Sequence, residues 1–227
     1  EVLREMTADF HVLYVETRDK SSAQVSRKAD YSVAALAQDL AAVTAHYQLA
    51  PSDYILLGSS LGGTAILECY RLLAAKPRCL VLIGPAALFH LPPMSYTVIR
   101  FFPPRLYLLI KPIIKLYLRL TQVDAKADYA QYEKYVRVLD SADPWKLKRG
   151  ALSLAHYQVW DRLAAIDCPT LIFGGVHDVM HIPENLKRIT DLLPQGRYLD
   201  LGTNRATHSP EMVVAVRVYL DELEHEG

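Results

Sequence analysis

The chain has 227 residues, of which 51% are apolar, and its 25 basic side chains balance 25 acidic ones. This length suits one substantial buried core, and the zero formal net charge gives no general attraction for nucleic acid, so no nucleic-acid partner is expected. Cys69, Cys79 and Cys168 are odd in number and lack a C-x-x-C spacing. We therefore predict neither a disulfide framework nor a zinc site, and expect all three to be buried as small apolar residues.

Short apolar runs along the chain predict buried strands, because they are nearly continuous rather than alternating. The runs are 11–16, 53–58, 79–84 and 169–174, and a further strand is expected at 197–201. Helical patterns lie between or after them at 33–47, with Ser32 as N-cap, at 61–76, and at 211–224, after Ser209 and Pro210. The alternation predicts an α/β fold with a mostly parallel sheet flanked by helices.

About a third of the chain interrupts this alternation between the strands at 79 and 169. The interruption contains helical patterns only, at 96–102, 105–120, 129–139 and 145–160. A helical insertion between two late strands explains it more simply than a second independent domain. We predict a core made of residues 1–87 and 168–227, with a helical insertion at 88–167.

The longest uncharged stretch, 79–99, has the length of a membrane span but is interrupted by glycine and proline. The interrupting residues are Gly84, Pro85, Pro92 and Pro93. Residues 1–10 lack the basic region and apolar run of an export signal. We expect no transmembrane helix and a cytoplasmic location, with membrane association left open.

Residues 58–62, Gly-Ser-Ser-Leu-Gly, match the pattern G-x-S-x-G, in which a tight strand-to-helix turn exposes a serine. A predicted strand precedes the pattern and a predicted helix follows it. Ser60 is therefore the candidate nucleophile. We expect a β-carbon at either Gly58 or Gly62 to crowd so sharp a turn.

A serine hydroxyl needs a base to become a nucleophile, and the base needs a third group to orient it. His208 is the candidate base, because it lies in a polar loop between the last predicted strand and the last helix. Asp178 is the candidate acid, since it follows the strand at 169–174; Asp200 is its rival but falls inside a strand. His177 and His181 flank Asp178 and suggest a metal site only weakly, so no metal or cofactor is expected.

With these residues the chain resembles the α/β-hydrolase superfamily, in particular capped serine hydrolases of the esterase and lipase type. The resemblance rests on residues 58–63, on 168–178 and on His208, and it spans nearly the whole chain. It implies that the insertion is a cap and that the backbone N–H of Leu61 is an oxyanion donor. Such enzymes usually carry three further strands and a second oxyanion donor before this point, so the natural protein is expected to begin before Glu1.

Residues 100–120 carry the main information on substrate. Five basic residues and no acidic one occur there, and Lys111, Lys115 and Arg119 recur every four residues on an apolar helix with Pro112 inside. Such a helix can contact an anionic membrane, cover an acyl pocket, or simply extend its basic side chains into water.

We therefore expect hydrolysis of small-molecule or lipid-like esters with an apolar acyl or alcohol part, through an acyl-Ser60 intermediate. A thioesterase, a carbon–carbon bond hydrolase and an inactive hydrolase-like binding protein remain alternatives, and no oligomeric state is predicted.

Overall fold

A computed structural model describes residues 2–89, 94–122, 129–178 and 181–226; Glu1, Pro92 and Pro93 lie outside them. The chain divides into two compact units, which are described separately. The first comprises Glu1–Val15, Leu36–Leu88 and Gln158–Gly227, and the second comprises Glu16–Ala35 and Phe89–Tyr157.

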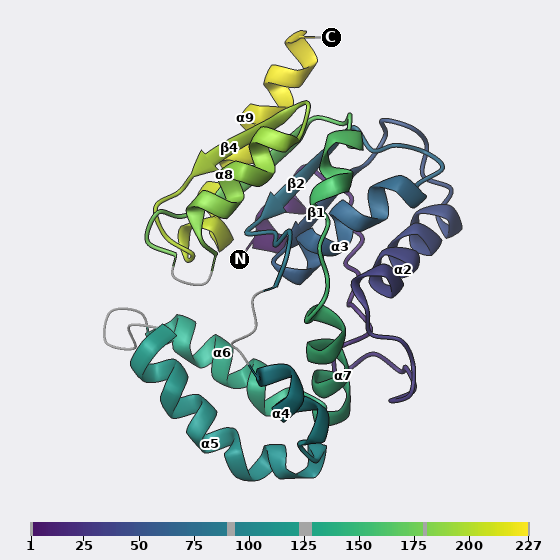
Figure 1. The fold of residues 1–227 in the computed structure, drawn as a ribbon. Coiled ribbons are helices and arrows are strands. Elements are labelled where there is room, and N and C mark those ends of the chain that lie inside the picture. The colour runs from purple at the N-terminus through teal and green to yellow at the C-terminus, as the bar shows by residue number, and fades with distance from the viewer. Residues whose placement is uncertain (1, 90–93, 123–128, 179–180, 227) are drawn as a thin grey trace. The chain divides into compact units, whose positions relative to one another are not determined.

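A parallel four-stranded sheet forms the centre of the first unit (Figure 1). Its strands are β1 (Ile55–Ser59), β2 (Cys79–Ile83), β3 (Thr170–Gly174) and β4 (Gly196–Asp200). Each strand pairs in parallel with the next one along the chain. The predicted α/β class with a parallel sheet is confirmed. Because all four strands point the same way, their carboxyl ends meet at one edge.

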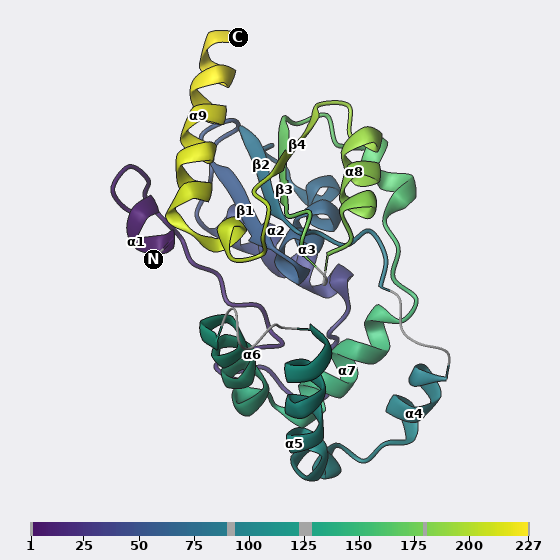
Figure 2. The ribbon, with the colours of Figure 1, turned by 90° about the vertical axis from the view of Figure 1, so that its left-hand side faces the viewer.

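Helices cover both faces of this sheet, as Figure 2 shows. Helices α1 (Val2–Met6) and α9 (Pro210–Glu226) lie on one face, where Met212 and Val216 join a buried cluster with Val81 and Phe173. On the other face lie α3 (Leu61–Cys69) and α8 (Pro183–Leu192), the latter absent from the prediction. Successive strand residues point to opposite faces, so both sets of helices find apolar partners.

The predicted helix after Ser32 is confirmed as α2 (Val33–His46), within which the boundary between the two units falls. The Ser32 hydroxyl accepts a hydrogen bond from the Ala35 backbone N–H at 3.2 Å, as expected of an N-cap. The three cysteines are buried and free, as predicted.

The strand predicted at 11–16 is wrong. These residues form neither helix nor strand, and Tyr14 is 69% exposed. A strand is stabilised by pairing with a neighbour, and in the described part of the chain the sheet contains only β1 to β4. The apolar run at 11–16 has no partner there.

The second unit is helical. Its helices are α4 (Ser95–Phe101), α5 (Tyr107–Tyr117), α6 (Tyr129–Ser141) and α7 (Pro144–Leu154). Short 3-10 and π turns at Pro104–Leu106 and Leu118–Gln122 flank α5. Helices α5 and α6 lie side by side (Figure 1), and the Tyr107 hydroxyl donates to the Leu139 carbonyl.

The observed boundaries of this unit differ from the predicted insertion at 88–167 in two places. Residues 16–35 join the helices, because the buried Lys146 ammonium donates to the carbonyls of Arg18, Lys20 and Ala23 at 3.2, 2.7 and 2.7 Å. Residues 158–167 belong to the first unit, where Leu163 is fully buried and Arg162 pairs with Glu68 of α3.

Within the described ranges, no helix combines the length and the apolar character that crossing a bilayer requires.

Replacing Lys146 by methionine is expected to lower the free energy of unfolding by about 2 to 4 kcal/mol, because three carbonyls lose a charged donor in a buried place. Urea unfolding followed by circular dichroism measures the change. The same substitution at the exposed Lys28 is the control, with an expected change within about 0.5 kcal/mol. Equal effects of the two substitutions would contradict this role for Lys146.

Candidate active site

The connection from β1 to α3 places Ser60 on a sharp turn at the carboxyl edge of the sheet. Ser60 has φ 50° and ψ −118°, a conformation that a non-glycine residue rarely adopts. Its backbone N–H donates to the Ile83 carbonyl of β2 at 2.7 Å, which ties the turn to the neighbouring strand. Leu61 is the first residue of α3, a position whose N–H has no acceptor within the helix.

The glycines around this turn differ in how much space surrounds them. A β-carbon at Gly58 would lie 2.7 Å from the Gly62 carbonyl carbon and 2.8 Å from the Gly63 nitrogen. At Gly62 a β-carbon would meet nothing within 4 Å. The expected crowding is therefore confirmed for Gly58 and wrong for Gly62. The second crowded glycine of the turn is instead Gly63, where a β-carbon would lie 3.1 Å from the Gly58 carbonyl oxygen.

Asp178 follows β3 and brings a carboxylate to the same edge of the sheet. Its side chain is only 4% exposed. One carboxylate oxygen, Oδ2, contacts His181 Nδ1 at 2.8 Å and accepts from the Asn204 amide at 2.7 Å. The other oxygen accepts from the His181 backbone N–H at 3.3 Å, which closes a local turn. The carboxylate thus holds a histidine of its own loop and an asparagine of the loop after β4.

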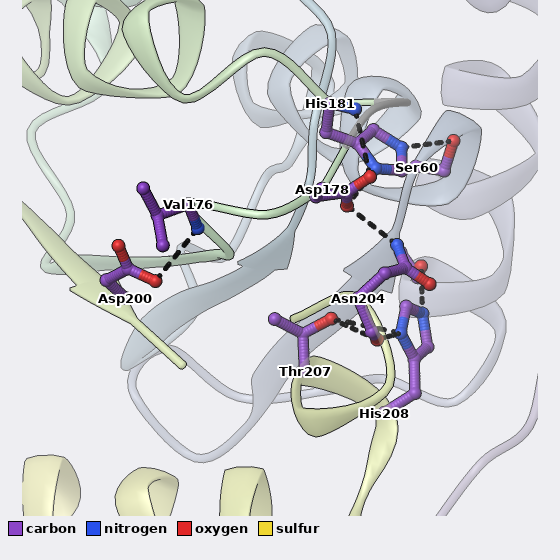
Figure 3. A network of polar contacts seen from close by, with 9 residues as sticks. Ser60, Val176, Asp178, His181, Asp200, Asn204, Thr207 and His208 are labelled. Atoms are coloured by element: carbon purple, nitrogen blue, oxygen red, sulfur yellow. Dashed lines mark hydrogen bonds and ion pairs between the residues drawn. The ribbon is translucent and has the colours of Figure 1, made fainter. Parts of the chain in front are cut away.

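His181 lies between this carboxylate and the nucleophile candidate. Its Nε2 is 3.3 Å from Ser60 Oγ, and its Nδ1 faces Asp178 (Figure 3). The ring packs against Gly84, where a β-carbon would lie 2.8 Å from the ring. Sequence reasoning treated His181 as a loop residue. The signal that could have identified it is its spacing of three residues from Asp178.

His208 ends a 3-10 turn after β4, and its ring also reaches the turn between β1 and α3. Its Nε2 is 2.8 Å from Ser59 Oγ, the hydroxyl beside Ser60 in sequence. Its Nδ1 is 2.9 Å from the Asn204 carbonyl oxygen, which also accepts from the Thr207 hydroxyl at 2.8 Å. A carbonyl can only accept, so Nδ1 carries a proton, and in the neutral imidazole Nε2 is then the acceptor for the Ser59 hydroxyl.

Asp200, the rival candidate for the acid, has a different place. It is the last residue of β4, and its Oδ1 accepts from the backbone N–H groups of Val176 and Gly202 at 3.1 and 2.7 Å. Figure 3 shows the bond from Val176. These bonds hold together the loops that carry Asp178 and Asn204. Across the described ranges, His, Cys, Asp and Glu side chains form no group of three that could hold a metal ion.

The site therefore contains two serine–histidine pairs on one sheet edge, Ser60 with His181 and Ser59 with His208. Asn204 links them, because its side-chain amide donates to Asp178 and its backbone carbonyl accepts from His208. A hydroxyl beside the acceptor nitrogen of an oriented imidazole can be deprotonated as it attacks an electrophile.

Replacing Gly58 by alanine is expected to lower the free energy of unfolding by about 2 to 4 kcal/mol, because the new methyl group meets backbone atoms that cannot move aside. Gly62→Ala, the matched control, is expected to change it by less than about 1 kcal/mol. Urea unfolding of both variants measures the difference. A Gly62→Ala variant as unstable as Gly58→Ala would refute the packing described for this turn.

The chain is similar to known proteins in sequence family and in fold. The model of the alpha/beta hydrolase family matches residues 17–215. No curated protein matches the chain. A solved esterase from Thermogutta terrifontis is similar over 97% of this chain and 83% of its own, with 23% identity and a TM-score of 0.78. A hydrolase from Oleispira antarctica is similar over 98% and 84%, with 15% identity and a TM-score of 0.79.

At these identities the solved structures show the fold alone, whereas the family model matches most of the sequence. The chain belongs to the alpha/beta hydrolase family.

Proposed function

We propose that this chain is a serine hydrolase that cleaves carboxylic esters with an apolar acyl or alcohol part. The observation that carries the proposal is the strained turn at Ser60, whose hydroxyl lies 3.3 Å from a histidine nitrogen at a sheet edge that also holds a buried carboxylate. Strain of this kind persists where the surrounding structure enforces it, and it is common at active sites. The similar esterase from Thermogutta terrifontis supports the ester class by analogy.

In the proposed reaction the Ser60 hydroxyl gives its proton to a histidine while its oxygen attacks the ester carbonyl carbon. The Leu61 backbone N–H donates to the oxyanion that forms. The histidine then protonates the leaving alcohol, which leaves an acyl-Ser60 ester. Finally the same histidine takes a proton from water while the water oxygen attacks the acyl carbon. It returns that proton to the Ser60 oxygen as the acyl–oxygen bond breaks and the acid leaves.

We assign the role of base to His208 rather than to His181. The contact of His181 with Asp178 has a local explanation, because the two residues are three apart and Asp178 also closes the turn by accepting from the His181 N–H. His208, in contrast, comes from the separate loop after β4. Its Nε2 contacts Ser59, 149 residues away in sequence, in the turn between β1 and α3. The proposed role requires His208 to contact Ser60 in place of its observed partner Ser59.

Asp178 acts on His208 through Asn204 in this proposal. The carboxylate accepts a hydrogen bond from the side-chain amide of Asn204, and the backbone carbonyl of Asn204 accepts one from His208 Nδ1–H. This arrangement favours the positive imidazolium that forms on His208 when Ser60 loses its proton, since the negative charge of Asp178 is separated from the ring only by Asn204.

Ser60→Ala is expected to lower the hydrolysis of short p-nitrophenyl esters by about 1,000-fold or more, because the covalent intermediate cannot form. It is also expected to abolish labelling by a fluorophosphonate probe. Ser59→Ala is the matched control and should keep both the ester hydrolysis and the labelling. Mass spectrometry of the labelled peptide locates the modified serine. Labelling at Ser59, or no labelling of a folded parent protein, would contradict the proposed nucleophile.

The two histidines are separated by a second pair of variants. General base catalysis contributes about 100 to 10,000-fold, so His208→Ala should lower kcat/KM by at least about 100-fold and His181→Ala by less than about tenfold. The reverse result would transfer the role of base to His181 and leave the hydrolase function in place. Loss of activity in neither variant would contradict the mechanism. Faster turnover of a matched thioester by the parent protein would change the substrate class.

A further inference from the structure

Several apolar residues of helix α5 in the second unit are exposed. The exposed residues on α5 and the π turn after it are, with exposures between 54% and 72%, Leu108, Leu109, Ile113, Leu116, Tyr117 and Leu120. We call these six the apolar face of α5. Other apolar residues of α5 point inward, as usual for a surface helix, since Tyr107 is buried and Ile110 and Ile114 are half-buried. The helix therefore has apolar residues on both sides.

Two basic residues of the same helix pair with its neighbour α6. Lys111 and Lys115 point to α6, where both bind the Asp140 carboxylate, at 3.2 Å and 2.8 Å. Their contacts hold the pKa of Asp140 below its usual range, chiefly through the hydrogen bond from Lys115. Lys111 and Lys115 therefore pair within the unit, while the leucines and Ile113 of the apolar face remain exposed.

The surroundings of the apolar face carry positive charge. Residues 94–122 contain no aspartate or glutamate, and Arg105 and Arg119 are exposed next to the apolar face. On the preceding helix α4, Phe101 is 76% exposed and adjoins Arg100 in sequence. Large contiguous apolar patches are rare on proteins that have no partner for them. A partner for this surface must accept leucine side chains and provide negative charge.

We propose that the apolar face of α5 docks onto an anionic phospholipid surface. Leucine and isoleucine side chains of an amphipathic helix enter the boundary between headgroups and acyl chains, and long arginine side chains at its margin reach the phosphates. The lysine–aspartate pairs hold α5 on α6 while its apolar face is in contact with lipid.

A second copy of the chain is a poorer occupant. A symmetric contact through this face would bring Arg100, Arg105 and Arg119 of two copies together without an acidic residue of 94–122 to compensate them. The proposal is independent of the reaction proposed for Ser60, because it concerns the second unit and needs no catalysis.

Vesicle sedimentation with the full 227-residue chain tests it. The chain is expected to sediment with vesicles made of equal parts phosphatidylglycerol and phosphatidylcholine, and much less with phosphatidylcholine alone. Added salt should weaken the binding, since the arginine contacts are screened. Absence of binding to the anionic vesicles, or equal binding to both kinds, would overturn the proposal.

Variants locate the contact. The triple variant Leu109→Ser, Ile113→Ser, Leu116→Ser is expected to bind anionic vesicles at least about tenfold more weakly, since its apolar contact with lipid is lost. Arg105→Gln and Arg119→Gln should each weaken binding about fivefold. The matched control replaces two exposed valines of α9, Val214→Ser and Val218→Ser, and should bind like the parent.

The arginine variants keep the proposal falsifiable if the triple variant does not fold, which circular dichroism detects. Unchanged binding in both arginine variants, or in a folded triple variant, would overturn the proposal. A parent chain that dimerises, ignores vesicles and becomes monomeric in the triple variant would identify a second copy as the occupant instead.

Discussion

At Ser60 the backbone turns from β1 into α3 through a positive φ of 50°, a conformation that costs a non-glycine residue about 1 to 3 kcal/mol. Two features sustain it. The Ser60 N–H is bound to the Ile83 carbonyl of β2, and Gly58 lets the backbone of Gly62 and Gly63 approach. Because the turn lies at the carboxyl end of β1, the loops after β3 and β4 converge on the same hydroxyl groups. Every other element of the site depends on this position.

The convergence brings together more hydrogen-bonding groups than one triad needs. Ser59 and Ser60 each contact a histidine, and Asp178 and Asn204 connect the two pairs. A buried carboxylate with several donors is held firmly, so its loop is anchored whichever histidine takes the proton. The proposed reaction uses Ser60 from one pair and His208 from the other. The His181 ring fills the space over Gly84, where a side chain would clash.

The second unit uses charge in a different way. Lys146 is buried and holds residues 16–35 through three carbonyls, while Lys111 and Lys115 bind Asp140. In both places long basic side chains connect segments that are far apart in sequence. The apolar face of α5 remains exposed, which is the basis of the proposed contact with lipid.

Local patterns in the sequence were sufficient for the parallel α/β class, the helix after Ser32 and the strand–turn–helix context of Ser60, because each depends on residues close along the chain. They failed for 11–16, since a strand requires a neighbour, and for Gly62, since free space depends on what packs nearby. They also missed His181 and Lys146. The Ser60 hydroxyl that His181 contacts and the carbonyls that Lys146 binds lie 121 to 128 residues away in sequence, so only tertiary structure decides these contacts.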